Sequence, residues 1–169
     1  MDFFDVAEKR ASVREYSSTP IPMEALEKII DTARRAPTAR GEEPWEFILI
    51  ENPQSLKQLA HITDHGRFLE KAVAAIVVVS KETKYYLEDC CAATQNILLA
   101  ATALGIGSCW IAGDKKQYAE EILKHCGVVK GYTLVSIVSL GYPKGPLLPH
   151  RKRPLSDVMH KERFCKKSQ

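Results

Sequence analysis

The sequence predicts a single domain built from layers of α-helices and β-strands. The chain has 169 residues, of which 45% are hydrophobic and 27% charged, and a chain of this length buries roughly 70% of its unfolded surface without disulfides. Segments with helical and strand periodicity alternate along it, with no repeat, low-complexity stretch or internal linker. These observations predict one layered α and β domain but leave the order of the strands open.

The first part of the chain predicts three helices, a loop and a strand. Asp2 is a capping residue for a short helix, and residues 12–16 are expected to be extended. Pro22 fits the first turn of the second helix, which ends before Pro37. The remaining elements are a polar loop at 38–44, a strand at 45–50, and a third helix capped by Asn52 with Pro53 in its first turn.

The second part predicts the buried centre of the fold. Residues 74–80 are continuously apolar and rich in β-branched side chains, which indicates a strand covered on both faces. The helix expected at 85–104 has apolar side chains over much of its own circumference, so it is expected to be central and mostly buried. The last elements are a strand at 108–111, a helix opened by a capping box at Asp114 and Gln117 and closed by Gly127, and a strand at 132–140.

The net charge of +3 hides an uneven distribution. Residues 144–169 contain eight basic and two acidic side chains, a net charge of +6, and the preceding residues carry a net charge of −3. A protein that binds nucleic acid more often carries its basic excess on the folded body, so no nucleic-acid partner is expected. Residues 144–169 are rich in Pro and Gly at their start, which predicts an extended C-terminal arm.

Several classes of protein are excluded by absences in the sequence. The longest apolar run, 72–79, is too short to cross a bilayer, and the N-terminus lacks the pattern of a signal peptide. The five cysteines and five histidines show no metal-ligand spacing, so no metal and a reducing, cytoplasmic location are expected. No serine or cysteine has the context of a nucleophile. A cofactor that carries the reaction would account for this absence.

Three segments are candidates for binding. Arg10, Ser12 and Arg14 alternate in an extended stretch, so they face one side and could receive a phosphate; the alternative is a solvated charged strand. The glycines of 105–113 join a helix to a strand, the reverse of the dinucleotide-binding fingerprint, and serve either as a helix cap or to let backbone approach a flat ligand. The loop at 36–45 is the third candidate, with Trp45 expected to pack.

In this order and spacing the segments resemble the FMN-dependent nitroreductase family in its short form. The motifs that carry the resemblance are Arg10-x-Ser12-x-Arg14, Ala36-Pro37-Thr38-Ala39 followed by Pro44-Trp45, Gly105-Ile106-Gly107-Ser108-Cys109-Trp110, Gly141-Tyr142-Pro143 and Arg151-Lys152-Arg153-Pro154-Leu155. The resemblance implies an α+β, three-layer fold with a central sheet flanked by helices, as one nitroreductase-like domain over 1–169. It also implies an intertwined homodimer with FMN at the subunit interface.

The resemblance further implies roles for individual residues. Arg10 and Ser12 hold the phosphate and ribityl end, Arg14 lies near the N1/O2 edge of the ring, and Pro37, Thr38 and Ala39 line the ring from the other subunit. Backbone at Ser108, Cys109 and Trp110 approaches N5 and O4. Arg151 and Arg153 reach back to the phosphate, with the choice among Arg151, Lys152 and Arg153 left open. Gly41 and Glu43 stand where the family has Asn and Gln, so substrate contacts of that loop stay open.

The implied reaction is ping-pong electron transfer. NADH or NADPH delivers hydride to flavin N5, and a nitroaromatic, quinone or similar small electrophile then takes the electrons, so no side chain is assigned as catalytic. Two alternatives stay open. One is specialised flavin chemistry on the same fold, such as dehalogenation, flavin fragmentation or azoline oxidation, and the other is a flavin- or nucleotide-binding module without catalysis.

Overall fold

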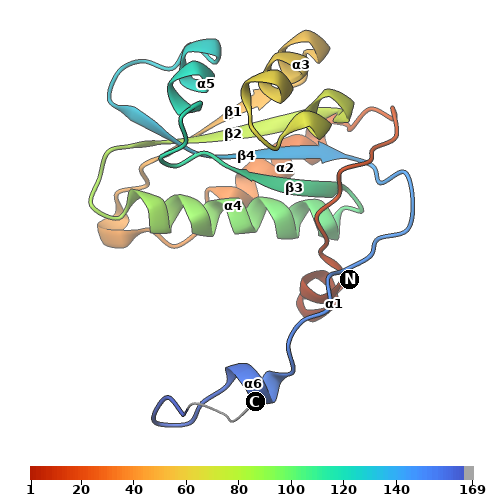
Figure 1. Ribbon diagram of the computed structural model, residues 1–169, viewed down its shortest axis with the longest axis vertical. Helices are drawn as coiled ribbons and strands as arrows, with labels where there is room; N and C mark the ends of the chain where they lie inside the picture. Colours follow the sequence, from red (N-terminus) through yellow and green to blue (C-terminus); the bar gives the residue numbers. More distant parts are fainter. Residues whose placement is uncertain (166–169) are drawn as a thin grey trace.

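A four-stranded antiparallel sheet in the order β1–β2–β4–β3 forms the centre of the computed structural model, which describes residues 1–165 (Figure 1). The elements are α1 (Phe3–Lys9), α2 (Met23–Ala33), η1 (Ala39–Gly41), β1 (Trp45–Ile50), α3 (Pro53–Ile62), η2 (Arg67–Lys71), β2 (Ala74–Lys81), α4 (Tyr86–Ala103), β3 (Gly107–Ala112), α5 (Ala119–His125), β4 (Tyr132–Gly141) and α6 (Leu155–Val158). The strands β1 and β3 form the two edges of the sheet.

Helices cover both faces of the sheet and make three layers. The helices α2 and α4 lie on one face, and α3 and α5 lie on the other (Figure 1). Residues 74–80 of β2 are buried throughout, as expected for a strand that is covered on both sides. The alternation of β2 and β4 side chains between two hydrophobic clusters therefore ties the three layers together.

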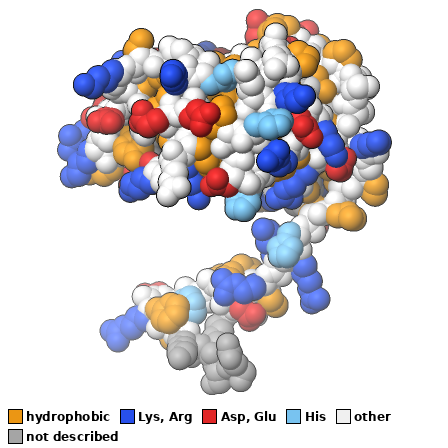
Figure 2. Space-filling model, turned by 45° about the horizontal axis from the view of Figure 1, so that its top comes forward, with side chains coloured by type: hydrophobic (Ala, Val, Ile, Leu, Met, Phe, Trp, Pro, Cys, Tyr) orange, Lys and Arg blue, Asp and Glu red, His pale blue; other side chains and the backbone are white. Residues whose placement is uncertain are grey.

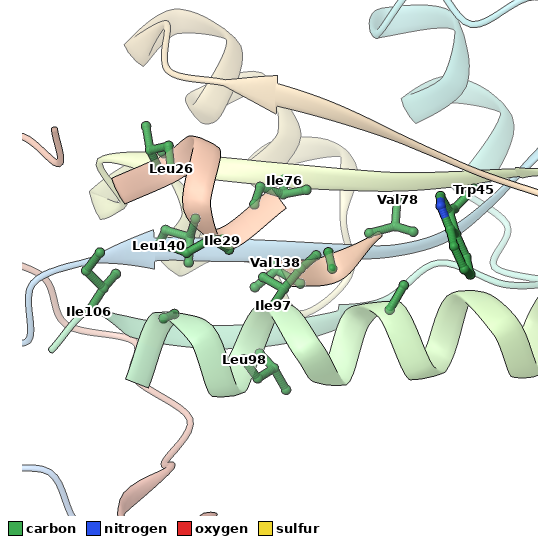
Figure 3. Close-up of a cluster of buried hydrophobic side chains, with 14 of the residues drawn as sticks. Leu26, Ile29, Trp45, Ile76, Val78, Ile97, Leu98, Ile106, Val138 and Leu140 are labelled. Carbon is green, nitrogen blue, oxygen red and sulfur yellow. The ribbon is translucent and has the colours of Figure 1, made fainter. Parts of the chain in front are cut away.

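The larger cluster joins α2 and α4 to the sheet. Leu26, Ile29 and Ile97 have no exposed surface and lie against Ile76 and Val138 of the two central strands (Figure 3). Burying one such side chain stabilises a fold by about 1.5–3 kcal/mol. The 18-residue helix α4 spans the length of the sheet, so this packing fixes both of its ends relative to the strands.

The turn from α4 into β3 is a helix cap. Gly105 adopts a φ of +72°, its N–H donates to the carbonyl of Thr102 at 3.0 Å, and the N–H of Ile106 donates to the carbonyl of Ala101 at 2.8 Å. These two bonds are the Schellman pattern of helix termination. Of the two roles expected for this glycine-rich turn, Gly105 has the capping role.

Two expected helix starts differ from the structure. The capping box at Asp114 and Gln117 is wrong, because α5 begins at Ala119 with Tyr118 before it and no side-chain cap. Lys115 has a φ of +55°, which breaks the helical path, and the Asp114 carboxylate instead accepts a hydrogen bond from the Tyr86 hydroxyl at 2.7 Å. Pro22 is the residue before α2 rather than a member of its first turn.

Backbone hydrogen bonds attach the start of the C-terminal arm to the body. The N–H of Ser17 donates to the carbonyl of Tyr142 at 2.8 Å, and the N–H of Lys144 donates to that of Glu15 at 3.1 Å. Beyond this point the arm projects from the body and carries exposed basic and apolar side chains (Figure 2). Two of the basic residues counted in the arm, Lys166 and Lys167, lie outside the described residues. In the described part of the chain, no helix is long and apolar enough to cross a membrane.

Candidate functional site

The segment after α1 presents Arg10, Ser12 and Arg14 outward. Ala11 and Val13 are buried, whereas Arg10 is half-buried and Ser12 and Arg14 are exposed. Ser12 forms a parallel bridge with Ser108 at the start of β3, and the Val13 N–H donates to the Ser108 carbonyl at 2.9 Å. The segment therefore extends the sheet beyond the edge strand β3, with its polar side chains on the outer side.

A buried tyrosine fixes this segment against the sheet. The Tyr16 hydroxyl contacts the Val13 carbonyl and lies 2.7 Å from Ser139 Oγ on β4. Burial raises the pKa of Tyr16 well above its ordinary value, so the hydroxyl keeps its proton and its hydrogen bonds. Neither Tyr16 nor Ser139 was predicted as a site residue, because no local pattern connects two residues so distant in the chain.

The basic residues of the N-terminal segment and of the arm line one hollow. Its volume is about 480 Å³, and its polar lining consists of Arg10, Ser12, Arg14, His150 and Arg151. Among residues 1–165 no carboxylate lines it, and the nearby Glu15 is paired with Lys71 at 3.2 Å. Three arginines and a serine among its lining residues give this hollow the chemistry that suits a phosphate or another compact anion. Neither Lys152 nor Arg153 lines this hollow.

Arg14 is also held by an aromatic ring. Its guanidinium carbon lies 5.6 Å from the centre of the Phe68 ring, within the range of a cation–π contact. Because Phe68 belongs to η2 on the body of the domain, this contact limits where an exposed arginine can point. The contact therefore favours one position of the Arg14 charge at the rim of the hollow.

The strand β3 offers backbone groups beside the hollow. The Ser108 carbonyl accepts a hydrogen bond from the Val13 N–H, so it points away from β4. N–H and C=O groups two residues apart in a strand point to the same side, so those of Trp110 face the open edge of β3. The Ser108 hydroxyl is buried and has no hydrogen-bond partner within residues 1–165. The structure thus places polar groups of Ser108 and Trp110 next to the basic segment.

Cys109 lies between these two residues and is not activated. Its side chain is 2% exposed, and burial raises the pKa of its thiol, although Arg14, Ser12 and Arg10 oppose the rise. A thiol that keeps its proton is a poor nucleophile. In the described part of the chain no three His, Cys, Asp or Glu side chains gather as a metal site.

The third predicted segment lies far from the hollow within one chain. Thr38 and Ala39 contact Asp89 near the start of α4, whereas Ala101 accepts the capping bond at its other end. The helix rises about 1.5 Å per residue, so these two points are about 18 Å apart along its axis. Figure 1 shows the loop and the N-terminal segment at opposite ends of the sheet. One chain therefore does not bring Pro37, Thr38 and Ala39 to Arg10 and Ser12.

The fold and the hollow define a three-layer α+β protein with a basic hollow at the edge of its sheet. The chain belongs to the nitroreductase family, since the sequence model of the family described as "Putative TM nitroreductase" matches residues 2–167. This match confirms the resemblance found in the sequence, and with it the α+β class and the assignment to the oxidoreductases.

Individual proteins agree with this family. A protein of Archaeoglobus fulgidus named "Putative NADH dehydrogenase/NAD(P)H nitroreductase" is 42% identical over 142 residues, which cover 80% of this chain and 82% of that protein. The solved structure of an FMN-dependent nitroreductase from Clostridium difficile superposes with a TM-score of 0.89 at 29% identity, covering 95% of this chain and 99% of that one. The iodotyrosine deiodinase of Nematostella vectensis is 30% identical over 162 residues, covering 87% of this chain and 59% of that protein.

Proposed function

We propose that the chain is an FMN-dependent oxidoreductase that takes electrons from NADH or NADPH and passes them to a small electrophile such as a nitroaromatic or a quinone. The observation that carries the proposal is the hollow in which Arg10, Ser12 and Arg14 meet Arg151. The phosphate monoester of FMN fits this receptor, because it is a compact dianion and the lining offers several cations and no carboxylate. The similarity to an FMN-dependent nitroreductase also supports it.

Each residue of the site has a role in this proposal. Arg10, Ser12 and Arg151 would hold the phosphate, with Arg153 in an outer position. Arg14 would place a cation beside the ring and stabilise negative charge there, and backbone of Ser108, Cys109 and Trp110 would meet the ring edge. When bound, FMN supplies two-electron chemistry in a ping-pong cycle. No side chain of the described hollow is needed as an acid, base or nucleophile.

The proposal includes a homodimer, because one chain holds only part of the site. Pro37, Thr38 and Ala39 lie about 18 Å along α4 from the turn beside the hollow, so a second copy would have to supply them. Apolar side chains of the arm support this assembly: Leu155, Met159 and Phe164 are 69%, 61% and 81% exposed in the single chain. A groove of about 440 Å³ between α1, α2 and α4 is lined mainly by apolar residues and would take such side chains.

The assembly is tested by sedimentation of the purified protein. The wild type is expected to sediment as a dimer, and Leu155→Asp combined with Phe164→Asp is expected to weaken the dimer and the binding of FMN together. Val129→Asp is the matched control, since Val129 is 69% exposed on the body and lies outside the arm. A monomeric wild type that binds FMN fully would contradict the shared site.

The catalytic proposal is tested by spectroscopy. Purified protein is expected to show a flavin absorption spectrum, to lose it on anaerobic addition of NADH or NADPH, and to recover it when a nitroaromatic or quinone is added. A protein that is colourless and takes up no FMN would overturn the proposal. A protein that binds FMN but is not bleached would be a flavin carrier without catalysis.

Reductive dehalogenation is a second candidate, supported by the 30% identity to an iodotyrosine deiodinase. It would use the same hollow and the same flavin but a different acceptor. Release of halide from a halogenated phenol by the reduced protein, at a rate exceeding that of nitroaromatic reduction, would favour it. The chain spans only 59% of that relative, so nitroaromatics and quinones are the first acceptors to test.

A further inference from the structure

A buried carboxylate on α4 is devoted to the loop at residues 37–43. Asp89 is only 4% exposed. Its Oδ2 accepts a hydrogen bond from the Thr38 hydroxyl at 2.8 Å, and both of its oxygens accept from the Ala39 N–H, at 3.1 and 3.2 Å. No ion pair to Asp89 is found in the part of the chain that the structure describes. A carboxylate is costly to bury, so these bonds are its compensation.

The loop needs an anchor of this kind. Arg40 and Glu43 have φ values of +60° and +43°, in the left-handed region that side chains other than glycine rarely adopt. The Thr38 hydroxyl donates to Asp89 and accepts from the Glu43 N–H at 3.0 Å. One hydroxyl therefore links the buried carboxylate to both the beginning and the end of the loop.

The start of α4 holds the loop at a second point. The guanidinium carbon of Arg40 lies 5.9 Å from the centre of the Tyr85 ring, immediately before α4. Arg40 and its cation–π contact are exposed, so they are weaker restraints than the buried Asp89. The anchoring of the loop therefore depends mainly on Asp89 and Thr38.

We propose that Asp89 is a positioning residue of the active site: its carboxylate fixes the loop 37–43 in the conformation in which Pro37, Thr38 and Ala39 line the flavin of the partner subunit. This inference rests on the proposed function. Asp89 itself is too deeply buried to touch flavin or substrate, and it acts through Thr38 and Ala39. The phosphate receptor lies at the other end of α4, so loss of Asp89 should disturb the ring side of the site and leave the phosphate side intact.

The test compares Asp89→Asn with Tyr86→Phe. The amide of Asp89→Asn nearly matches the carboxylate in shape but loses the charge and turns one acceptor into a donor. Tyr86→Phe is the matched control, because Tyr86 lies on the same end of α4 and its hydroxyl bonds Asp114, away from the loop. Amide hydrogen exchange at Ala39 and Glu43, FMN affinity, and kcat/KM with NADH or NADPH are measured for both.

The expected result separates a positioning role from a merely structural one. In Asp89→Asn, exchange at Ala39 and Glu43 should accelerate about tenfold or more, and kcat/KM should fall about 10- to 100-fold, as expected for a misplaced active-site segment. FMN affinity should fall by a smaller factor than kcat/KM, since the phosphate receptor is intact. Tyr86→Phe should leave all three near the wild-type values.

Thr38 variants keep the proposal testable if Asp89→Asn fails to fold. Thr38→Val removes the hydroxyl and is expected to accelerate the same exchange, whereas Thr38→Ser keeps it and is expected to keep exchange slow. Unchanged exchange in Asp89→Asn or Thr38→Val, or a loss of kcat/KM no larger than that of Tyr86→Phe, overturns the proposal. Failure of the wild type to bind or reduce FMN would instead contradict the proposed function, while the exchange measurements would still report on the anchor.

Discussion

Replacing Gly107 by alanine should displace the segment that carries the basic residues of the hollow. A Cβ atom at Gly107 would lie 2.8 Å from Val13 Cγ2 and 2.9 Å from both Val13 Cβ and Cγ1. Carbon atoms pack best at about 3.5–4.0 Å, so the segment at Val13 and the strand at Gly107 must separate by about 0.6–1.2 Å. All three atoms of the branched side chain obstruct the new methyl group, and χ1 of valine is restricted, so the backbone itself must move.

The expected cost follows from these contacts. Overpacking of this kind costs about 1–3 kcal/mol. The Val13–Ser108 hydrogen bond of 2.9 Å adds about 1 kcal/mol if the movement breaks it. Gly107→Ala should therefore lower the free energy of unfolding by about 2–4 kcal/mol. Because Arg10, Ser12 and Arg14 lie on the displaced segment, the affinity for FMN should also fall by about tenfold or more.

The assays are denaturant unfolding and fluorescence titration with FMN under conditions where both proteins are folded. Adding Val13→Ala removes the obstructing methyl groups, so the double variant should regain affinity relative to Gly107→Ala, a coupling that a double-mutant cycle measures. The reasoning is refuted if Gly107→Ala changes neither stability nor affinity, or if Val13→Ala restores nothing.

Three further predictions follow from individual contacts. Arg151→Ala should weaken FMN binding by about tenfold or more, since it removes a charged partner of the phosphate. Arg153 lies outside the hollow, so Arg153→Ala should change FMN affinity less than about threefold. Equal losses of affinity in titrations of the two variants would contradict this prediction. Asn52→Ala should destabilise the fold by about 1 kcal/mol, because Asn52 Oδ1 accepts from the N–H groups of Gln54 and Ser55 at 2.9 and 3.1 Å; denaturant unfolding measures the loss, and FMN affinity should not change. The pKa of Tyr86 is raised from 10.0 to about 12, mainly because its hydroxyl donates to the Asp114 carboxylate. The contribution of Tyr86 to stability is therefore present below pH 10 and is lost as the pH rises towards 12. Unfolding at several pH values should show a steeper loss of stability for the wild type than for Tyr86→Phe, and parallel curves would count against this prediction.

The parts of the fold that depend on local chemistry could be predicted from the sequence. The continuously apolar run at 74–80 is the buried strand β2, and Asp2 and Asn52 cap their helices through side-chain oxygens. The alternation of Arg10, Ser12 and Arg14 with buried neighbours also follows from the period of an extended chain. In each case the residues that decide the conformation are near neighbours in the sequence.

The parts that depend on distant pairs could not be predicted. The order of the strands, the bond between Tyr16 and Ser139, and the anchoring of Thr38 by Asp89 each join residues far apart in the chain. Asp114 fitted a capping box by its spacing alone, but its carboxylate accepts a hydrogen bond from the Tyr86 hydroxyl instead. Among the three basic residues at 151–153, only Arg151 lines the hollow, and no periodicity in the irregular arm distinguishes it.

The proposed site depends above all on binding of the FMN phosphate in the hollow between residues 10–14 and the arm. The most direct test is to titrate the same protein with FMN and with riboflavin, which share the ring and differ in the phosphate. FMN is expected to bind at least about a hundredfold more tightly, since more than one charge-assisted hydrogen bond to the phosphate would be lost with riboflavin, and added salt should reduce the difference. Equal affinities for the two flavins would contradict binding of the phosphate in the hollow.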